Sequence, residues 1–241
     1  MEDILPYFIA LLDLTTPIVR RFLSPDIRYN LGVADTHLLS KVTAFITRAS
    51  PTGRELLLIR HPYAGVQIPA GTVEPDETPE HAVLREAHEE TGLTHFLPGH
   101  YLGCLDELRP EGSWVVRQQT PVHARPYLGS FEWAYFRRGL AVRELRQQAG
   151  FVQVTYEEWD HLLEPQFITY QITGWVPTLA LCRGTRRHFY HLPVPVGELP
   201  QNWRQQADQH DFELFWAPLE APPDIIYPQD EWLEYARQKL T

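Results

Sequence analysis

The sequence predicts an α/β protein, and three observations support this fold class. Residues 41–48 and 55–60 are rich in β-formers and are separated by a turn cluster, which indicates a hairpin. A short helix is expected between Thr78 and Gly92, and a further strand is expected at 100–105. Strands that alternate with a helix in this way are typical of α/β folds.

The helix is predicted from its two ends. Thr78 can cap the first turn, and Pro79 suits the first helical position because its missing N–H would have no partner there. Glu80 places a negative charge in the first turn, where the helix dipole favours it. Gly92 supplies the stop. The side expected to pack inward comprises Val83, Leu84, Ala87 and Thr91.

Glu86, Glu89 and Glu90 fall at spacings i, i+3 and i+4 of this helix and therefore share one stripe. Each like-charge pair costs roughly 0.2–0.5 kcal/mol on an exposed helix. A divalent cation would remove the repulsion, and hard cations such as Mg²⁺ or Mn²⁺ prefer carboxylate oxygen. For three glutamates considered alone, a solvated acidic face is the more frequent arrangement.

The spacing of the whole stretch favours the metal site. From Gly71 there follow Glu77, the pair Arg85–Glu86, the pair Glu89–Glu90 and then Gly92, with apolar residues at Ala87 and Leu93. This pattern resembles the Nudix box, the signature of the Nudix hydrolases. The resemblance implies a Nudix-type α/β/α sandwich with a mixed sheet.

The resemblance also implies a set of functional residues. Glu77 and Arg85 correspond to the pair that holds the loop against the helix in that family. Ala70 stands where the family commonly has a glycine whose carbonyl contacts metal. The candidate metal ligands are Glu86, Glu89, Glu90 and the carbonyl of Ala70, and the candidate catalytic residues are Glu86, Glu89, Glu90 and Arg85.

The function implied is a hydrolase dependent on Mg²⁺ or Mn²⁺ that cleaves a pyrophosphate bond in a nucleoside diphosphate linked to another group. The ions would lower the pKa of a bound water, and a glutamate would accept its proton. Substrate-binding residues are not identified. Pro110 lies seventeen residues beyond Leu93, whereas ADP-ribose hydrolases of the family have a proline about fifteen or sixteen beyond the box. Two alternatives remain: a non-catalytic Nudix-fold module that senses a nucleotide, and an RNA-processing member of the family.

The chain is expected to have three parts. Residues 1–38 form an N-terminal extension, and residues 39–241 form the Nudix domain, interrupted by an insertion at about 111–187. The insertion holds nine arginines and seven acids, a net charge of +2, against −12 for the remainder. It either walls the substrate cleft with arginines and aromatic rings or folds around a small core of its own. Within it, Thr155–Glu158 resembles a capping box that opens a helix, and 167–176 alternates as a strand does.

The parts of the chain that flank the insertion also carry predictions. Strands are expected at Val66–Ile68, His188–Val194 and Phe212–Leu219, with an amphipathic helix at 230–240. His188 and His191 would fall on opposite faces of their strand, which argues against a zinc pair. Three acids near the last strands are weaker candidates for the catalytic base: Asp208, Asp211 and, by name, Glu213.

Charge and composition limit the partners. The net charge is −10, and the box alone holds seven acids against Arg85, which favours cation capture over nucleic-acid binding. Two cysteines fit a reducing compartment. The apolar run Ile4–Leu14 is too short to span a bilayer, so we expect a cytoplasmic protein that acts on a small nucleotide-type molecule away from membranes. Pro17–Leu23 is expected to pack on the core or to contact a second copy in a homodimer.

Overall fold

The structure is a computed structural model that describes residues 38–62, 65–160, 167–195, 197, 199–207 and 210–240. The N-terminal extension apart from Leu38, including Ile4–Leu14 and Pro17–Leu23, lies outside the described residues, as does Asp208. None of the helices in the described part of the chain is long and apolar enough to cross a membrane.

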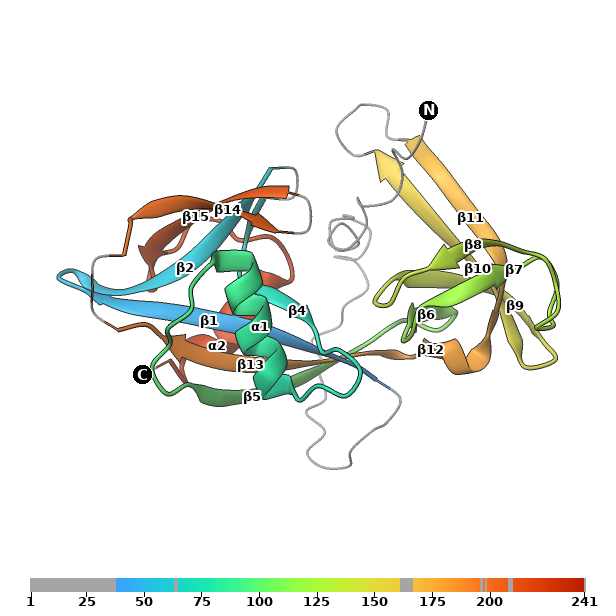
Figure 1. Ribbon diagram of the computed structural model, residues 1–241, viewed down its shortest axis with the longest axis horizontal. Coiled ribbons are helices and arrows are strands. Elements are labelled where there is room, and N and C mark those ends of the chain that lie inside the picture. Colours follow the sequence, from blue (N-terminus) through green and yellow to red (C-terminus); the bar gives the residue numbers. More distant parts are fainter. Residues whose placement is uncertain are drawn as a thin grey trace.

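The first of two sheets forms the left-hand body in Figure 1. Its path is β14-β15-β2-β1-β13-β5, with β3 paired to β2 and β4 paired to β1. The sheet is mixed, because β1 and β13 run parallel while the other pairs are antiparallel. Its strands are β1 (Leu39–Ser50), β2 (Gly53–His61), β3 (Gly65–Gln67), β4 (Ala70–Thr72), β5 (His100–Leu108), β13 (Gly184–Pro193), β14 (Asn202–Ala207) and β15 (His210–Pro218).

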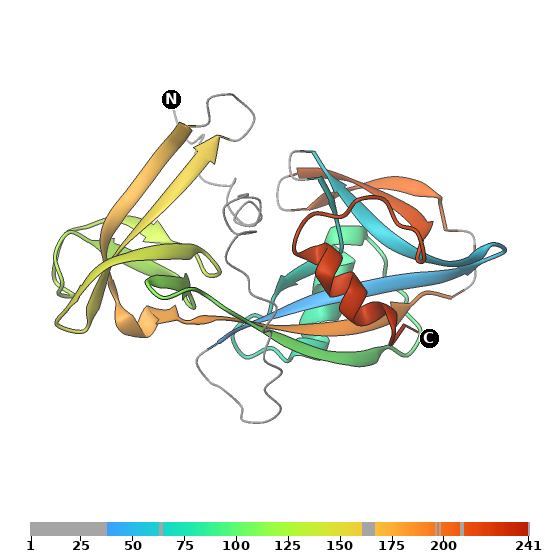
Figure 2. The ribbon, with the colours of Figure 1, turned by 180° about the vertical axis from the view of Figure 1, so that it is seen from behind.

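Two helices cover the two faces of this sheet. Helix α1 (Pro79–Thr91) crosses the face seen in Figure 1, and α2 (Gln229–Arg237) crosses the opposite face, seen in Figure 2. Because the even-numbered residues of β1 face α1 and Phe45 faces α2, the strand is buried on both sides. The predicted α/β/α sandwich is confirmed.

The predicted elements of the sandwich all occur, with small changes at their ends. The hairpin of β1 and β2 turns between Ser50 and Gly53, which pair across the turn. The strand expected at 100–105 extends to Leu108 because it pairs with β13 as far as Gly184. The last helix is shorter than expected and ends at Arg237.

The second sheet forms the right-hand body in Figure 1 and consists of seven strands in the order β12-β6-β9-β10-β11-β7-β8. It has its own hydrophobic core, which includes Val122, Phe136, Val152 and Val176. The chain enters it after β5 and leaves it into β13. Its elements are β6 (Ser113–Val116), β7 (Thr120–His123), β8 (Glu132–Phe136), β9 (Ala141–Gln148), β10 (Phe151–Asp160), β11 (Phe167–Pro177), the 3₁₀ turn η2 (Thr178–Ala180) and β12 (Leu181–Cys182).

Two features of this region differ from expectation. Thr155–Glu158 does not open a helix, because it lies in β10, where Thr155 pairs with Arg143 on one side and Thr173 on the other. Arg186 and Arg187, expected within the insertion, lie in β13 of the first sheet. There they pair with Asp106 at 2.6 Å and Glu107 at 3.5 Å, so their charges serve the core sheet.

Candidate functional site

Helix α1 begins and ends where its sequence predicts. The backbone N–H of His81 donates to the Thr78 side-chain oxygen at 3.3 Å. Gly92 has φ 74°, a left-handed conformation that glycine adopts without strain, and its N–H donates to the His88 carbonyl at 2.8 Å. Because both ends of the helix are fixed, Glu86, Glu89 and Glu90 have defined orientations relative to the sheet.

The three glutamates are buried to different degrees. Taking Val83 as the centre of the inward face, Glu90 lies about 20° away, Glu86 about 60° and Glu89 about 120° at 100° per residue. The structure follows this order: Glu90 is 8% exposed, the Glu86 side chain 16% and the Glu89 side chain 54%. Leu84, expected to pack inward, is about 100° from Val83 and is 43% exposed.

Glu86 and Glu90 both bind the strand β4 that precedes the helix. The Glu90 carboxylate accepts from the Ala70 N–H at 2.9 Å, and that of Glu86 accepts from the Thr72 N–H at 3.2 Å. Gly71 lies between them, and a Cβ on it would lie 1.9 Å from the Glu86 carboxyl carbon. Only glycine lets the carboxylate approach β4 this closely.

Arg85 connects the loop to the helix. Its guanidinium donates to both carboxylate oxygens of Glu77 at 3.0 Å and to the Thr72 carbonyl at 3.1 Å. It also contacts Glu86 at 2.9 Å and Glu89 at 3.1 Å. The hydrogen bonds from Arg85 lower the pKa of Glu77, whereas burial raises the pKa of Glu86 despite the nearby guanidinium.

The donor set fits a hard cation, because carboxylate and carbonyl oxygens are the ligands that Mg²⁺ and Mn²⁺ prefer. The raised pKa of Glu86 means that its charge is poorly solvated, and a cation beside it would offset that cost. Within the described residues, however, no three His, Cys, Asp or Glu side chains converge closely enough to hold a metal ion. Glu86 and Glu90 face β4, whereas Glu89 faces Arg85, so joint coordination requires Glu89 to turn.

The weaker candidates lie elsewhere. Alternate residues of β15 face opposite sides, and Phe212 packs in the core beneath α1, so Asp211 and Glu213 point to the other face. Glu213 contacts Arg60 there at 3.6 Å. His188 and His191 lie on opposite faces of β13, where His188 contacts Tyr101 and His191 contacts Thr47.

Two further side chains lie near this face: Gln67, which was not among the predicted site residues, and Arg138, which was predicted only as one of the nine arginines of the insertion. Gln67 is opposite Ile59 in the β2–β3 pair and therefore lies on the face that carries α1. It is 5% exposed, and its amide nitrogen has no hydrogen-bond partner in the described structure. Arg138 donates to the carbonyl of Val73 from the second sheet. No sequence signal predicts the Arg138 contact, since the two residues are far apart along the chain.

The mixed sheet, the capped helix and its carboxylates define a Nudix-type domain. Residues 39–131 match the family model described as NUDIX domain. The match covers the box and ends inside the second sheet.

The solved structures that this chain resembles are similar to it only distantly. The NUDIX domain of Shewanella oneidensis NrtR complexed with ADP ribose is 14% identical, with a TM-score of 0.42, and the match covers 95% of this chain and 100% of that one. The MutT protein from Methanosarcina mazei Go1 is 17% identical, with a TM-score of 0.38 over 87% and 100% of the two chains. A C. elegans Ap4A hydrolase binary complex is 12% identical, with a TM-score of 0.37 over 84% and 98%. No curated protein matches the sequence. At these values, none of the three structures informs the substrate of this chain.

Proposed function

We propose that this protein is a divalent-metal-dependent hydrolase that cleaves a pyrophosphate bond in a nucleoside diphosphate linked to another group. The observation that carries the proposal is the complete box between Gly71 and Leu93, on a helix whose Glu86 and Glu90 lie against Ala70 and Thr72. In the proposed site, Glu86, Glu89, Glu90 and the Ala70 carbonyl hold Mg²⁺ or Mn²⁺.

Each protein group has a distinct task in this proposal. Glu90 and Glu86 fix β4, so the Ala70 carbonyl keeps its direction. Glu89 is the most exposed of the three carboxylates and is therefore best placed to turn toward substrate and accept a proton from the attacking water. Arg85 positions the loop through Glu77 and Thr72. Bound divalent ions supply charge neutralisation at the phosphates and acidify water.

The bond changes are those of a simple hydrolysis. The water oxygen bonds to phosphorus, the bond from phosphorus to the bridging oxygen breaks, and the bridging oxygen leaves with the second phosphate. The water proton passes to the carboxylate. Both products carry a phosphate group.

The decisive experiment is a screen of nucleoside diphosphate derivatives with Mg²⁺ and Mn²⁺ that detects phosphate-containing products. For an accepted substrate, Glu89→Gln and Glu90→Gln should each abolish turnover while the fold is retained. Glu213→Gln is the matched control, because Glu213 is a half-exposed acid on the opposite face of the sheet, and it should retain wild-type activity. Unchanged turnover in Glu89→Gln and Glu90→Gln would contradict the assigned roles.

A second candidate is a non-catalytic module that senses a nucleotide. The observation that favours it is that Arg85 forms ion pairs with Glu77, Glu86 and Glu89. Two of these carboxylates, those of Glu86 and Glu89, are proposed metal ligands that already have a cationic partner. Tight nucleotide binding without hydrolysis in millimolar Mg²⁺ would support it over the hydrolase.

The cellular setting is part of the same proposal. Cys104 and Cys182 are both free thiols, which fits the cytoplasmic location that we propose. The acidic net charge disfavours nucleic acid as a substrate. RNA binding that weakens steeply with salt would reopen the RNA-processing alternative.

A further inference from the structure

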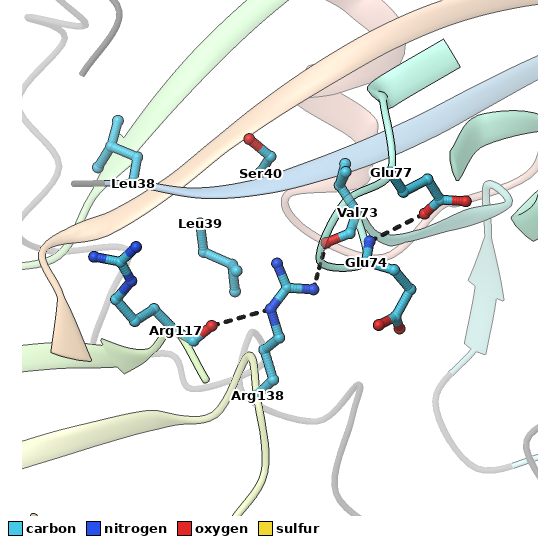
Figure 3. Close-up of a pocket in the computed structure, with 8 residues that line it drawn as sticks. All are labelled: Leu38, Leu39, Ser40, Val73, Glu74, Glu77, Arg117 and Arg138. Carbon is cyan, nitrogen blue, oxygen red and sulfur yellow. Dashed lines mark hydrogen bonds between the residues drawn. The ribbon is translucent and has the colours of Figure 1, made fainter. Parts of the chain in front are cut away.

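A pocket of about 240 Å³ lies where the two sheets meet, beside the loop that follows β4 (Figure 3). Arg117, directly after β6, and Arg138, after β8, line it from the second sheet. The start of β1 and the loop of the Nudix box form the other walls. None of Glu86, Glu89 and Glu90 lines this pocket, so it is distinct from the proposed metal site.

The two arginines have different surroundings. Arg138 donates to the backbone carbonyls of Val73 and Arg117, and burial lowers its pKa. The guanidinium of Arg117 makes no hydrogen bond or ion pair with any residue that the structure describes. Figure 3 shows the two guanidinium groups at separate points along the pocket, with Leu39 between them. The guanidinium of Arg117 therefore keeps all of its N–H donors available for a ligand, and that of Arg138 keeps some of them.

The charge in the pocket is positive on balance. Glu77 also lines it, but its carboxylate is bound at both oxygens by Arg85 and turns away from Arg117 in Figure 3. Glu74 remains as one acid against two guanidinium groups. Leu39 and Val73 line part of the wall, where Arg117 is exposed and Arg138 is half-buried.

We propose that this pocket binds a diphosphate group, with Arg117 and Arg138 each contacting one phosphoryl end. A guanidinium fork suits phosphate oxygens because it can donate two parallel hydrogen bonds. Two such forks at separate points favour an anion with two phosphoryl groups over a single phosphate.

Occupancy of the pocket reaches the metal loop through Arg138. Successive backbone groups of that loop are held from two sides: Ala70 and Thr72 by glutamates of α1, and Val73 by Arg138. A phosphoryl group that recruits Arg138 competes with the Val73 carbonyl for the same guanidinium. Binding in the pocket would therefore release the Val73 carbonyl, and so would affect the position of the backbone segment that includes Ala70.

The diphosphate has two possible sources. Since the proposed hydrolase holds the scissile pyrophosphate at the metal site, a diphosphate in this pocket is either a further part of the substrate, in which case the inference rests on the proposed function, or part of a separate small molecule. The binding experiment is independent of both, because it is done in EDTA, where no divalent metal is available to the box. Sodium pyrophosphate and sodium phosphate are titrated into the full chain at constant ionic strength, with binding followed by calorimetry.

Pyrophosphate should bind saturably and more tightly than phosphate. Arg117→Ala should weaken pyrophosphate binding about tenfold or more, as expected for loss of a charge-assisted hydrogen bond. Arg117→Lys keeps the charge without the fork and should fall between. Arg143→Ala is the matched control, since Arg143 is an exposed arginine of the second sheet that does not line the pocket, and it should bind within about twofold of wild type.

Three results would overturn the site: no saturable binding, wild-type affinity in both Arg117 variants, or an equal loss in Arg143→Ala. For an active enzyme, a raised KM at unchanged kcat in Arg117→Ala identifies the substrate as the source. Pyrophosphate binding that persists at saturating substrate identifies a separate molecule. If no substrate is ever turned over, the titration in EDTA still decides the inference.

Discussion

The carboxylate of Glu90 accepts a 2.9 Å hydrogen bond from the backbone N–H of Ala70, although both residues are candidate metal ligands. Glu90 is 8% exposed and lies close to the centre of the inward face of α1. The same side chain therefore has a structural task and a proposed chemical one.

Glu90→Ala should destabilise the fold, because it leaves the Ala70 N–H without its partner in a poorly hydrated position. The expected loss is about 1–3 kcal/mol in the free energy of unfolding. Glu89→Ala removes a half-exposed carboxylate of the same helix and should change that free energy by no more than about 0.5 kcal/mol. Urea denaturation of both variants measures the difference. Equal effects would show that Glu90 does not hold β4.

Gly71→Ala should displace Glu86, since the new Cβ would lie 1.9 Å from its carboxyl carbon. We expect a loss of about 1–3 kcal/mol in the free energy of unfolding, typical of overpacking, and weaker Mn²⁺ binding. Gly197→Ala is the control, because a Cβ there meets nothing within 4 Å. Thermal denaturation and Mn²⁺ titration of the two variants test the prediction, which fails if both behave alike.

Arg85→Lys should destabilise the loop even though the charge is kept. Lysine cannot reproduce the fork that binds both oxygens of Glu77 and the Thr72 carbonyl. The expected loss is about 1–3 kcal/mol in unfolding free energy. Arg60→Lys alters a half-exposed ion pair, in which Arg60 lies 3.6 Å from Glu213. It should lower the free energy of unfolding by less than about 0.5 kcal/mol. A comparable loss in both variants would remove the special role of Arg85.

Acid should destabilise the protein through two buried histidines. Burial lowers the pKa of His61 to about 4, with a contribution from His210, and lowers that of His191 to about 4, with a contribution from Arg54. Near pH 5 the unfolded chain therefore binds more protons than the folded one. The stability from each neutral histidine is complete above about pH 6.5 and is lost as the pH falls to about 4, at up to about 1.4 kcal/mol per pH unit.

Urea denaturation at pH 7.5, 6.0 and 5.0 measures this loss. His191→Gln should flatten the curve relative to wild type, whereas His95→Gln, at an exposed position, should leave its slope unchanged. Comparison between variants is needed because Glu86 acts in the opposite direction: burial raises its pKa, so its ionisation costs stability as the pH rises above about 4.5. Parallel curves for wild type and His191→Gln would contradict the prediction.

Local signals in the sequence predicted the helix, and the resemblance of its spacing to the Nudix box predicted the sandwich. Thr78 and Gly92 define the ends of α1 through contacts within a few residues, and the spacing between Gly71 and Leu93 predicts which carboxylates share a stripe. The same helical phase also places Glu90 inward. The i, i+3 and i+4 spacing alone placed it on one stripe with Glu86 and Glu89, whereas a carboxylate is rarely buried unless it has a partner. That partner, the Ala70 N–H, is visible only in three dimensions.

Non-local pairing explains what the sequence did not predict. Thr155–Glu158 has the residues of a helix start, but Thr155 is held between Arg143 and Thr173 on neighbouring strands. Tertiary pairing overrides a local capping pattern in such cases. Arg138 gives no sequence signal for its contact with Val73, because the contact depends on how the two sheets meet.

Strand β1 pairs in parallel with β13, so that Leu39 lies opposite Thr185. In the sequence, the whole second sheet lies between these two strands. The ribosome therefore releases the whole seven-stranded body, in which β7–β8, β9–β10 and β10–β11 pair consecutive strands, before the sandwich receives its central partner strand. Until then β1 has an open edge, and late, long-range closure of this kind is slow and exposes chains to aggregation. A fragment that stops at residue 131, where the family match ends, would lack β13 and would keep that edge permanently.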